Sequence, residues 1–209
     1  MKQPKTTRPP LLPSRLKRDD WLDAAFNAVV EGGFDAVRVL VLADTLGVTR
    51  GSFYWHFSDH AELISALLMR WHAREIESSR SLEAEPAGSA QADLERVLDF
   101  ALAHAGTDLE NMRFELALRG LGRRDAAVAT MLAEVDQTRL SLFERKFERL
   151  TGDAKAANSL AALFYLAIVG SFQALARPAN PPQLEQYLKG IIGKYLIQGQ
   201  VPVNGAKAT

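Results

Sequence analysis

Residues 39–57, "VLVLADTLGVTRGSFYWHF", contain the pattern that decides the fold of this chain. The spacing of apolar residues predicts a short helix over Val39–Leu46, and Gly47 follows where the chain needs the positive φ that glycine adopts at little cost. A second short helix, capped by its first residue, is expected over Thr49–His56. Ala43 is small where the two helices would cross at close range. Together these features predict a helix-turn-helix.

The second of these helices crowds aromatic residues together, and its spacing sends some of them outward. Phe53 is expected to turn inward with Leu42, Leu46 and Val48, and Phe57 to fold back before the next helix. The outward set is then Arg50, Gly51, Ser52, Tyr54, Trp55 and His56. A guanidinium can bind guanine O6 and N7, hydroxyls reach bases or phosphates, and glycine lets the backbone approach a duplex. The pattern therefore predicts a DNA-reading surface.

The rest of the chain is also expected to be helical, and no alternating run predicts a strand. Asp19 and Asp20 are expected to open a first helix that Gly32 and Gly33 close, and Ser58 or Asp59 to cap a fourth that continues past Ile76. Residues 84–91 predict a linker, after which helices are expected at about 92–105, 109–121, 125–150, 154–176 and 183–198. The expected fold class is all-α, with a three-helix N-terminal domain and a helical C-terminal domain.

Charge and composition limit the kinds of partner. The 209 residues have a formal net charge of zero and include no cysteine, which favours a reducing, cytoplasmic setting and local rather than global contact with a polyanion. Residues 1–18 contain six basic residues and no acid, whereas residues 19–60 contain two basic and seven acidic residues. The N-terminal segment shows no apolar signal sequence. We expect residues 1–17 to form a flexible basic arm.

The segment 159–176, "SLAALFYLAIVGSFQALA", has no charged residue. Its length is at the lower limit for a membrane-spanning helix, which needs about 20 mostly apolar residues. Polar side chains interrupt it, and the chain has no second segment of this kind. We therefore expect a fully buried helix rather than a membrane span.

Three stretches resemble the DNA-binding domain of the TetR family of repressors. They are "AAFNAVVEGGFDAV" (24–37), "LADTLGVTRGSFYWHF" (42–57) and "AELISALL" (61–68), and the resemblance covers about residues 18–70. It implies a homodimer that binds a double-stranded DNA operator, with a C-terminal domain over residues 71–199 that binds a small molecule and lowers DNA affinity. Residues 200–209 are expected to form a flexible tail.

The resemblance also assigns DNA-contact positions. Carried over, the contacts fall on Arg50, Gly51, Ser52, Tyr54, Trp55 and His56, and we add Thr49 at the start of the same helix. Arg38 stands where many family members have a capping Ser or Thr, and His60 where a lysine is usual; both are included as DNA contacts. The first turn of the preceding helix, residues 39–41, is apolar instead of polar. His56 and His60 are separated by the expected Ser58–Asp59 cap, so we predict no metal site.

The C-terminal domain offers candidates for effector binding and for dimerisation. Aromatic and polar residues that could line a ligand cavity are His104, Met112, Arg113, Phe114, Phe143, Phe164, Tyr165, Phe172 and Gln173, although cores use the same residue types. Arg119 is a further polar candidate for orienting a ligand. Residues expected to pair the last two helices of each subunit in a four-helix bundle are Ala167, Gly170, Ser171, Ala174, Leu184, Tyr187, Leu188, Ile191, Ile192 and Tyr195. The alternative is that both helices pack within one monomer.

The sequence therefore predicts a ligand-responsive transcriptional repressor that binds a palindromic operator as a homodimer. An activator or a partner-controlled regulator would share the DNA site but lack the small-molecule pocket. No nucleophile–base pair, metal motif or phosphate loop predicts an enzyme, and no cofactor is expected.

Overall fold

The computed structural model describes residues 16–85, 88–106, 109–175 and 183–199, and within those ranges the regular elements are all helical. The N-terminal helices are α1 (Arg18–Gly32), the 3-10 turn η1 (Phe34–Ala36), α2 (Val39–Thr45), α3 (Arg50–Phe53) and α4 (His60–Ala84). They are followed by α5 (Ala90–Gly106), α6 (Leu109–Gly122), α7 (Ala126–Thr151), α8 (Ala154–Leu175), α9 (Leu184–Ile192) and the π-helical turn η2 (Gly193–Ile197). The predicted all-α fold is confirmed.

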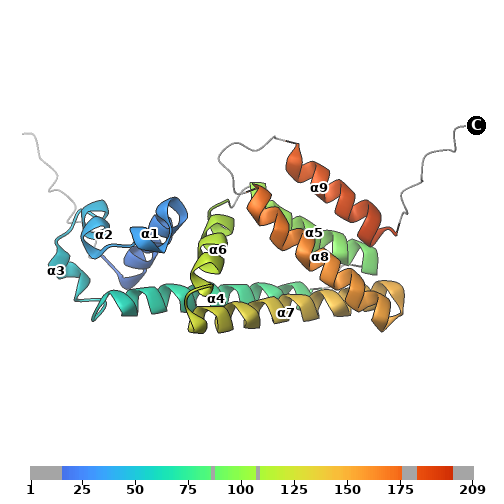
Figure 1. Cartoon of the computed structure of the whole chain (residues 1–209), viewed down its shortest axis with the longest axis horizontal. Coiled ribbons are helices and arrows are strands. Elements are labelled where there is room, and N and C mark those ends of the chain that lie inside the picture. The colour runs from blue at the N-terminus through green and yellow to red at the C-terminus, as the bar shows by residue number, and fades with distance from the viewer. Residues whose placement is uncertain (1–15, 86–87, 107–108, 176–182, 200–209) are drawn as a thin grey trace, which may run out of the picture.

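The molecule is elongated, and α4 connects its two ends (Figure 1). Helices α1, α2 and α3 form one end, and α4 leads away from them to lie alongside α7. Helix α6 contacts both α1 and α7, while α5, α8 and α9 pack together at the other end. The proposed basic arm (1–17) and tail (200–209) lie almost wholly outside the described residues.

The helix-turn-helix forms as the local sequence signals predict. The end of α3 and the start of α1 differ from the expectation. Gly47 has φ +67°, and the Val48 amide donates to the Ala43 carbonyl (2.9 Å), so the predicted tight turn is confirmed. Helix α3 is shorter than expected, since turns replace the helix after Phe53. Helix α1 begins at Arg18, with Lys17 as its N-cap residue and the Asp20 carboxylate accepting from the Lys17 amide (2.6 Å). Asp19 and Asp20 lie in the first turn as expected, but the expectation that one of them is the cap is wrong.

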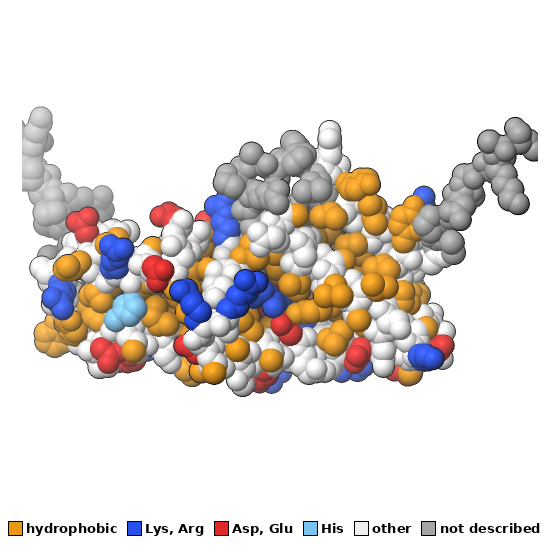
Figure 2. Space-filling view, in the orientation of Figure 1, with side chains coloured by type: hydrophobic (Ala, Val, Ile, Leu, Met, Phe, Trp, Pro, Cys, Tyr) orange, Lys and Arg blue, Asp and Glu red, His pale blue; other side chains and the backbone are white. Residues whose placement is uncertain are grey.

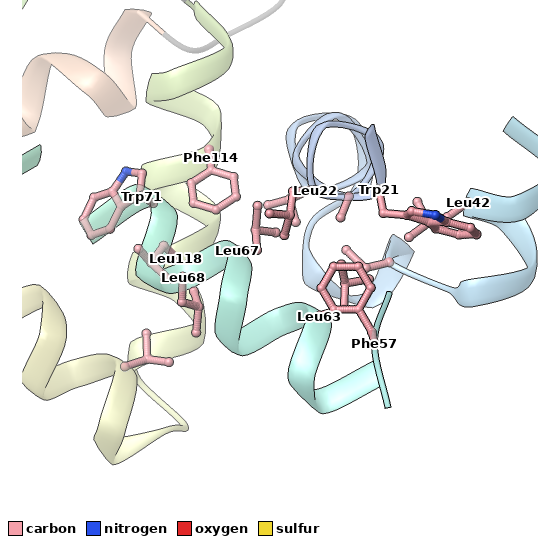
Figure 3. Packing of buried hydrophobic residues seen from close by; sticks show 14 of the residues in the cluster. Trp21, Leu22, Leu42, Phe57, Leu63, Leu67, Leu68, Trp71, Phe114 and Leu118 are labelled. Carbon is pink, nitrogen blue, oxygen red and sulfur yellow. The ribbon is translucent and has the colours of Figure 1, made fainter. Parts of the chain in front are cut away.

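The core of the N-terminal end continues into the C-terminal half. Buried side chains of α1 (Trp21, Leu22), α4 (Leu63, Leu67, Trp71) and α6 (Phe114, Leu118) belong to one hydrophobic cluster. Figure 3 shows Leu67 of α4 between Leu22 of α1 and Phe114 of α6. The proposed boundary between residues 70 and 71 falls inside α4, within this cluster. The two proposed domains therefore share one hydrophobic cluster. Their division into a DNA-binding part and a ligand-binding part remains a prediction.

Helix α8 does not have the environment expected for it. One face packs against α7 and carries buried Ala161, Phe164 and Ile168, but Leu163 and Leu166 on the other face are 55% and 64% exposed. The expectation of a fully buried helix is wrong, because a single chain supplies packing partners for only one side. By length and composition alone, residues 154–174 would also suffice to cross a membrane.

Candidate DNA-binding surface and effector cavity

The outward face of α3 and of the turn that follows it carries the side chains expected there from the sequence pattern. Trp55 is 80% exposed and Tyr54 is 51% exposed, while Phe53 is fully buried, with its ring 5.4 Å from Trp21 (edge-on) and 5.4 Å from Phe57 (stacked). The Arg50 guanidinium donates to the Tyr54 hydroxyl (3.0 Å) and lies 5.8 Å from its ring centre. Tyr54 therefore holds Arg50 on the exposed surface.

The remaining expected contacts on this helix surround Arg50. Thr49 is the N-terminal cap residue and is exposed, although its side chain makes no capping bond. Ser52 and His56 are half-buried. A Cβ added to Gly51 would lie 3.6 Å from Thr49 Oγ1, which is ordinary contact, so the fold itself does not require glycine there. Their roles in DNA binding stay predictions.

Arg38 and His60 make contacts that hold the motif together. Arg38 Nε donates to the Asp35 carbonyl (3.3 Å) from the position before α2, and its side chain caps no amide. His60 Nε2 donates to the Val37 carbonyl (2.7 Å), which ties the start of α4 to the segment before α2. These bonds give both residues a positioning role that sequence reasoning did not anticipate. A contact to phosphate remains a prediction for each.

Apolar side chains occupy part of this surface. Leu40, in the first turn of α2, is 65% exposed, and Val41 beside it is also exposed. Arg18 is engaged within the fold, since it pairs with Glu62 (3.2 Å) and covers the Phe57 ring at 4.5 Å. Because apolar groups contact thymine methyls, Leu40 and Val41 are candidate DNA contacts absent from the set expected from sequence.

A cavity of about 250 Å³ lies in the C-terminal half, between α4, α5, α6, α7 and α8. Its apolar wall includes Leu82, Phe100, Met112, Phe143, Ile168 and Phe172. Its polar wall includes Arg74, Glu75, Ser78, Asn111, Glu115 and Arg139, with Tyr165 also in the lining. A mostly apolar pocket with a few polar groups is typical of a small-molecule site.

Four of the expected effector-site residues line this cavity, namely Met112, Phe143, Tyr165 and Phe172. Four others are not in its lining, and the placement expected for them is corrected: Arg113, Phe114, Phe164 and Gln173. The position of each residue around its helix explains three of these four placements. Phe114 faces α1 and stacks on Phe26 (4.9 Å), Phe164 packs behind the wall against Phe147 (5.6 Å), and Gln173 faces solvent. The side chain of His104 lies outside the described residues.

An ion-pair network forms the polar side of the cavity. Arg139 bonds Glu75 (2.7 Å) and Glu115 (2.9 Å), and Arg119 bonds Glu115 (2.7 Å) and Asp136 (2.7 Å). Arg74 pairs with Glu75 and also donates to Asn111. Burial raises the pKa of Glu115, but Arg139 and Arg119 outweigh it and hold that pKa below its usual range. The network joins α4, α6 and α7.

Tyr165 stays protonated at neutral pH. Burial, followed by a hydrogen bond to Asp136, raises the pKa of its phenol to about 12. The network thereby also reaches α8, the fourth helix that it joins. Of the charged residues in it, only Arg119 was expected from sequence to orient a ligand, because each of the others alone resembles an ordinary surface residue.

The expected dimerisation residues divide into exposed and buried sets. Gly170 and Tyr187 are exposed, and Ala167, Ala174, Leu188, Ile191 and Tyr195 are half-buried. Ser171 and Ile192 are buried within the protomer, which corrects their expected placement on an intersubunit face; Ser171 Oγ donates to the Ile168 carbonyl (2.6 Å). The side chain of Leu184 lies outside the described residues.

The outer face of α8 is more apolar than the expected set suggested. Leu163, Leu166 and Gly170 recur at helical spacing on this face and are exposed. Figure 2 shows hydrophobic side chains gathered over the half that contains α5, α8 and α9. The alternative of packing within one monomer holds in part, since Ile192 and Ile197 join the core of the protomer.

In the described part of the chain, no group of three metal-ligating side chains is found.

Known proteins match both the motif and the fold. Residues 22–67 match the family model for "Bacterial regulatory proteins, tetR family". The HTH-type transcriptional regulator TtgR of Pseudomonas putida is 38% identical over 64 residues, which are 31% of this chain and 30% of TtgR. The tetracycline repressor protein class D of Escherichia coli is 31% identical over 110 residues, 49% of this chain and 50% of that protein. The sequence matches thus span half or less of these relatives.

The likeness in fold extends over nearly the whole chain. A transcriptional regulator from Rhodococcus sp. Rha1 superposes with a TM-score of 0.71 at 20% identity, over 90% of this chain and 100% of that one. At that identity the likeness concerns the fold alone. Residues 22–67 therefore form a DNA-binding domain of the TetR family of bacterial regulatory proteins, within a fold that a solved transcriptional regulator shares over nearly the whole chain.

Proposed function

We propose that this chain is a cytoplasmic transcriptional repressor that binds a palindromic operator as a homodimer and releases it when a small molecule occupies the cavity. The observation that carries the proposal is that two helices take part in both sites. Helices α4 and α6 supply wall residues of the cavity, and the same helices pack against α1, which in turn packs against α2 of the helix-turn-helix.

The reading surface supports specific base contacts. Arg50 is exposed and held by Tyr54, so its guanidinium is placed to bind a guanine edge in the major groove. Tyr54 and His56 suit phosphate oxygens, which fix register without reading sequence. In a two-fold dimer the centres of the two half-sites would lie about 34–36 Å apart or a multiple of that distance.

The coupling between the two sites would pass through α4 and α6. Glu75 and Ser78 of α4 line the cavity, and His60 at the start of the same helix is bonded to Val37 before α2. On α6, Glu115 lines the cavity while Phe114 stacks on α1. A ligand that displaced either helix would move the reading surface, and coupling energies between such sites are typically about 1–3 kcal/mol.

The outer face of α8 supports the homodimer. Leu163 and Leu166 form an exposed apolar stripe, and Gly170 leaves room for close approach of a second helix. Pairing α8 and α9 of two subunits would bury this stripe in a four-helix bundle. The cavity favours a ligand-responsive regulator over a partner-controlled one, while promoter position would distinguish a repressor from an activator.

The proposal is tested by selecting bound sequences from a random DNA pool with the full chain. We expect a palindrome to be enriched, with two chains bound per site in analytical ultracentrifugation. Arg50→Ala should lose discrimination between this palindrome and random DNA, whereas Tyr54→Phe should weaken binding to both and, because it removes the hydroxyl that holds Arg50, reduce discrimination only in part. A monomer with no sequence preference would refute the proposal. Ligands found by thermal shift that leave operator affinity unchanged would refute its effector part.

A further inference from the structure

We infer that the cavity selects an uncharged, mainly apolar effector that contains more than one ring or an equivalent aliphatic body. This inference rests on the proposed role of the cavity as an effector site. Three observations support it. The charged groups of the cavity wall compensate one another, aromatic residues form its apolar wall, and one hydroxyl in the wall makes no hydrogen bond within the described part of the chain.

The first observation is that the charged groups of the wall are already compensated. Arg139 is bonded to Glu75 and Glu115 through three hydrogen bonds of 2.7–2.9 Å, and Arg74 pairs with Glu75. Behind Glu115, Arg119 is paired in turn with Asp136. Among the described residues, three guanidiniums thus meet three carboxylates. A charged ligand would find no counter-charge without breaking an existing pair, and an uncompensated charge is costly to bury.

The second observation is the apolar wall. Phe100, Phe143 and Phe172 come from three different helices, and Leu82 and Ile168 extend the surface between them. Aromatic rings favour other rings in stacked or edge-on contact. A cavity of about 150 Å³ lined by apolar side chains can hold one benzene molecule. At about 250 Å³, this cavity has room for a larger body.

The third observation is the hydroxyl of Ser78, which lies in the cavity wall on α4. It makes no hydrogen bond to any group in the part of the chain that the structure describes. A hydroxyl can both donate and accept, so it suits a neutral hydroxyl or carbonyl of the ligand. Because Ser78 belongs to the helix that leads to the DNA-binding end, a bond there would act on the element that must move.

The test uses three bicyclic probes of similar shape: 2-naphthol, which is neutral, 2-naphthoate, an anion, and 2-naphthylmethylammonium, a cation. Their dissociation constants for the full chain are measured by calorimetry at pH 7. We expect 2-naphthol to bind at least tenfold more tightly than either charged probe. Naphthalene should bind the Ser78→Ala variant as it binds the unmodified chain, whereas 2-naphthol should lose affinity severalfold.

The charge balance is tested by Glu75→Gln, which leaves Arg139 and Arg74 with less compensation. This variant should shift the preference toward 2-naphthoate by at least tenfold relative to 2-naphthol. Glu77→Gln is the matched control, since Glu77 is on the same helix, pairs with Arg80 on the surface (3.6 Å) and is not in the cavity lining. It should leave the preference unchanged.

Two results would overturn the inference in different ways. If either charged probe binds the unmodified chain as tightly as 2-naphthol, or if Glu75→Gln leaves the preference unchanged in a variant whose circular dichroism is unaltered, the charge argument is wrong but the effector site stands. If no probe of any charge binds, the inference fails together with the proposed effector role of the cavity.

Discussion

Replacing Glu115 by glutamine should destabilise the protein more than any comparable change at its surface. The carboxylate is 5% exposed and accepts four hydrogen bonds, two each from Arg119 and Arg139, at 2.7–3.0 Å. Glutamine removes the charge and turns one acceptor oxygen into a donor that faces a guanidinium. One charge-assisted bond is then lost, worth about 1.5–3 kcal/mol, and the two arginines are left under-compensated. Removing one partner of a buried ion pair typically costs about 3–5 kcal/mol, which we expect here.

The same residue predicts a dependence on pH. Burial raises the pKa of Glu115, but the attraction of Arg139 and Arg119 is larger, so the folded-state pKa lies below its ordinary value of 4.5. A carboxyl group with a lowered folded pKa stabilises the protein fully above its unfolded pKa, and this stabilisation is lost as the pH falls through the folded pKa. The difference in unfolding free energy between the unmodified chain and Glu115→Gln should therefore shrink as the pH falls below about 4.5.

Urea unfolding followed by circular dichroism, at fixed protein concentration and at pH 7 and below 4.5, measures both effects. Glu77→Gln is the control, because its exposed pair with Arg80 is of a kind worth about 0–1 kcal/mol. A loss below about 1 kcal/mol for Glu115→Gln at pH 7 would contradict the claim that the network stabilises the fold. A difference that stays constant on acidification would mean that Glu115 is not the ionised member of the network.

Four further changes test the packing, the turn, the reading surface and the dimer face. Phe114→Ala should cost about 3–5 kcal/mol of unfolding free energy, still in one transition by tryptophan fluorescence and circular dichroism, because its ring is buried against α1; separate transitions would contradict the shared core. Gly47→Ala should cost roughly 1–2 kcal/mol, because φ is +67° there, and an unchanged Tm would argue against strain. Uracil in place of an operator thymine beside Leu40 should weaken binding by about 0.8 kcal/mol per methyl group, roughly fourfold. Leu40→Ala should abolish that sensitivity, and equal sensitivity in both proteins would exclude the contact. Leu166→Glu should yield a monomer in sedimentation, whereas the equally exposed Met69→Glu on α4 should not; a Leu166→Glu dimer would reject the α8 interface.

The DNA-binding motif was predictable because its signals are local. Gly47 marks the turn through its own φ, and the inward position of Phe53 follows from its spacing to the apolar residues before it. Leu40 was not assigned a role, because an apolar residue at the start of a helix is ordinarily a core residue. Its exposure depends on how α2 crosses α1, which is a property of the assembled motif.

The cavity was predictable only in part. Helical spacing identifies which residues face inward, but an inward residue can face either a void or a neighbouring side chain. Met112 and Phe114 are two positions apart on α6 and are both buried, yet one lines the cavity and the other stacks on α1. The pairing of Glu75 with Arg139 joins residues 64 positions apart, and no local pattern encodes it.

Helix α8 shows what the composition of a helix leaves undecided. The charge-free segment 159–176, most of which lies in this helix, indicated burial on all sides, and the fold of one chain buries only the side that carries Phe164 and Ile168. Leu163 and Leu166 remain in water, where large apolar patches usually mark a binding surface. The composition of a helix reflects all the surfaces that the helix packs against, including surfaces of another molecule. A second copy of α8 would complete the environment that the composition of this helix predicts.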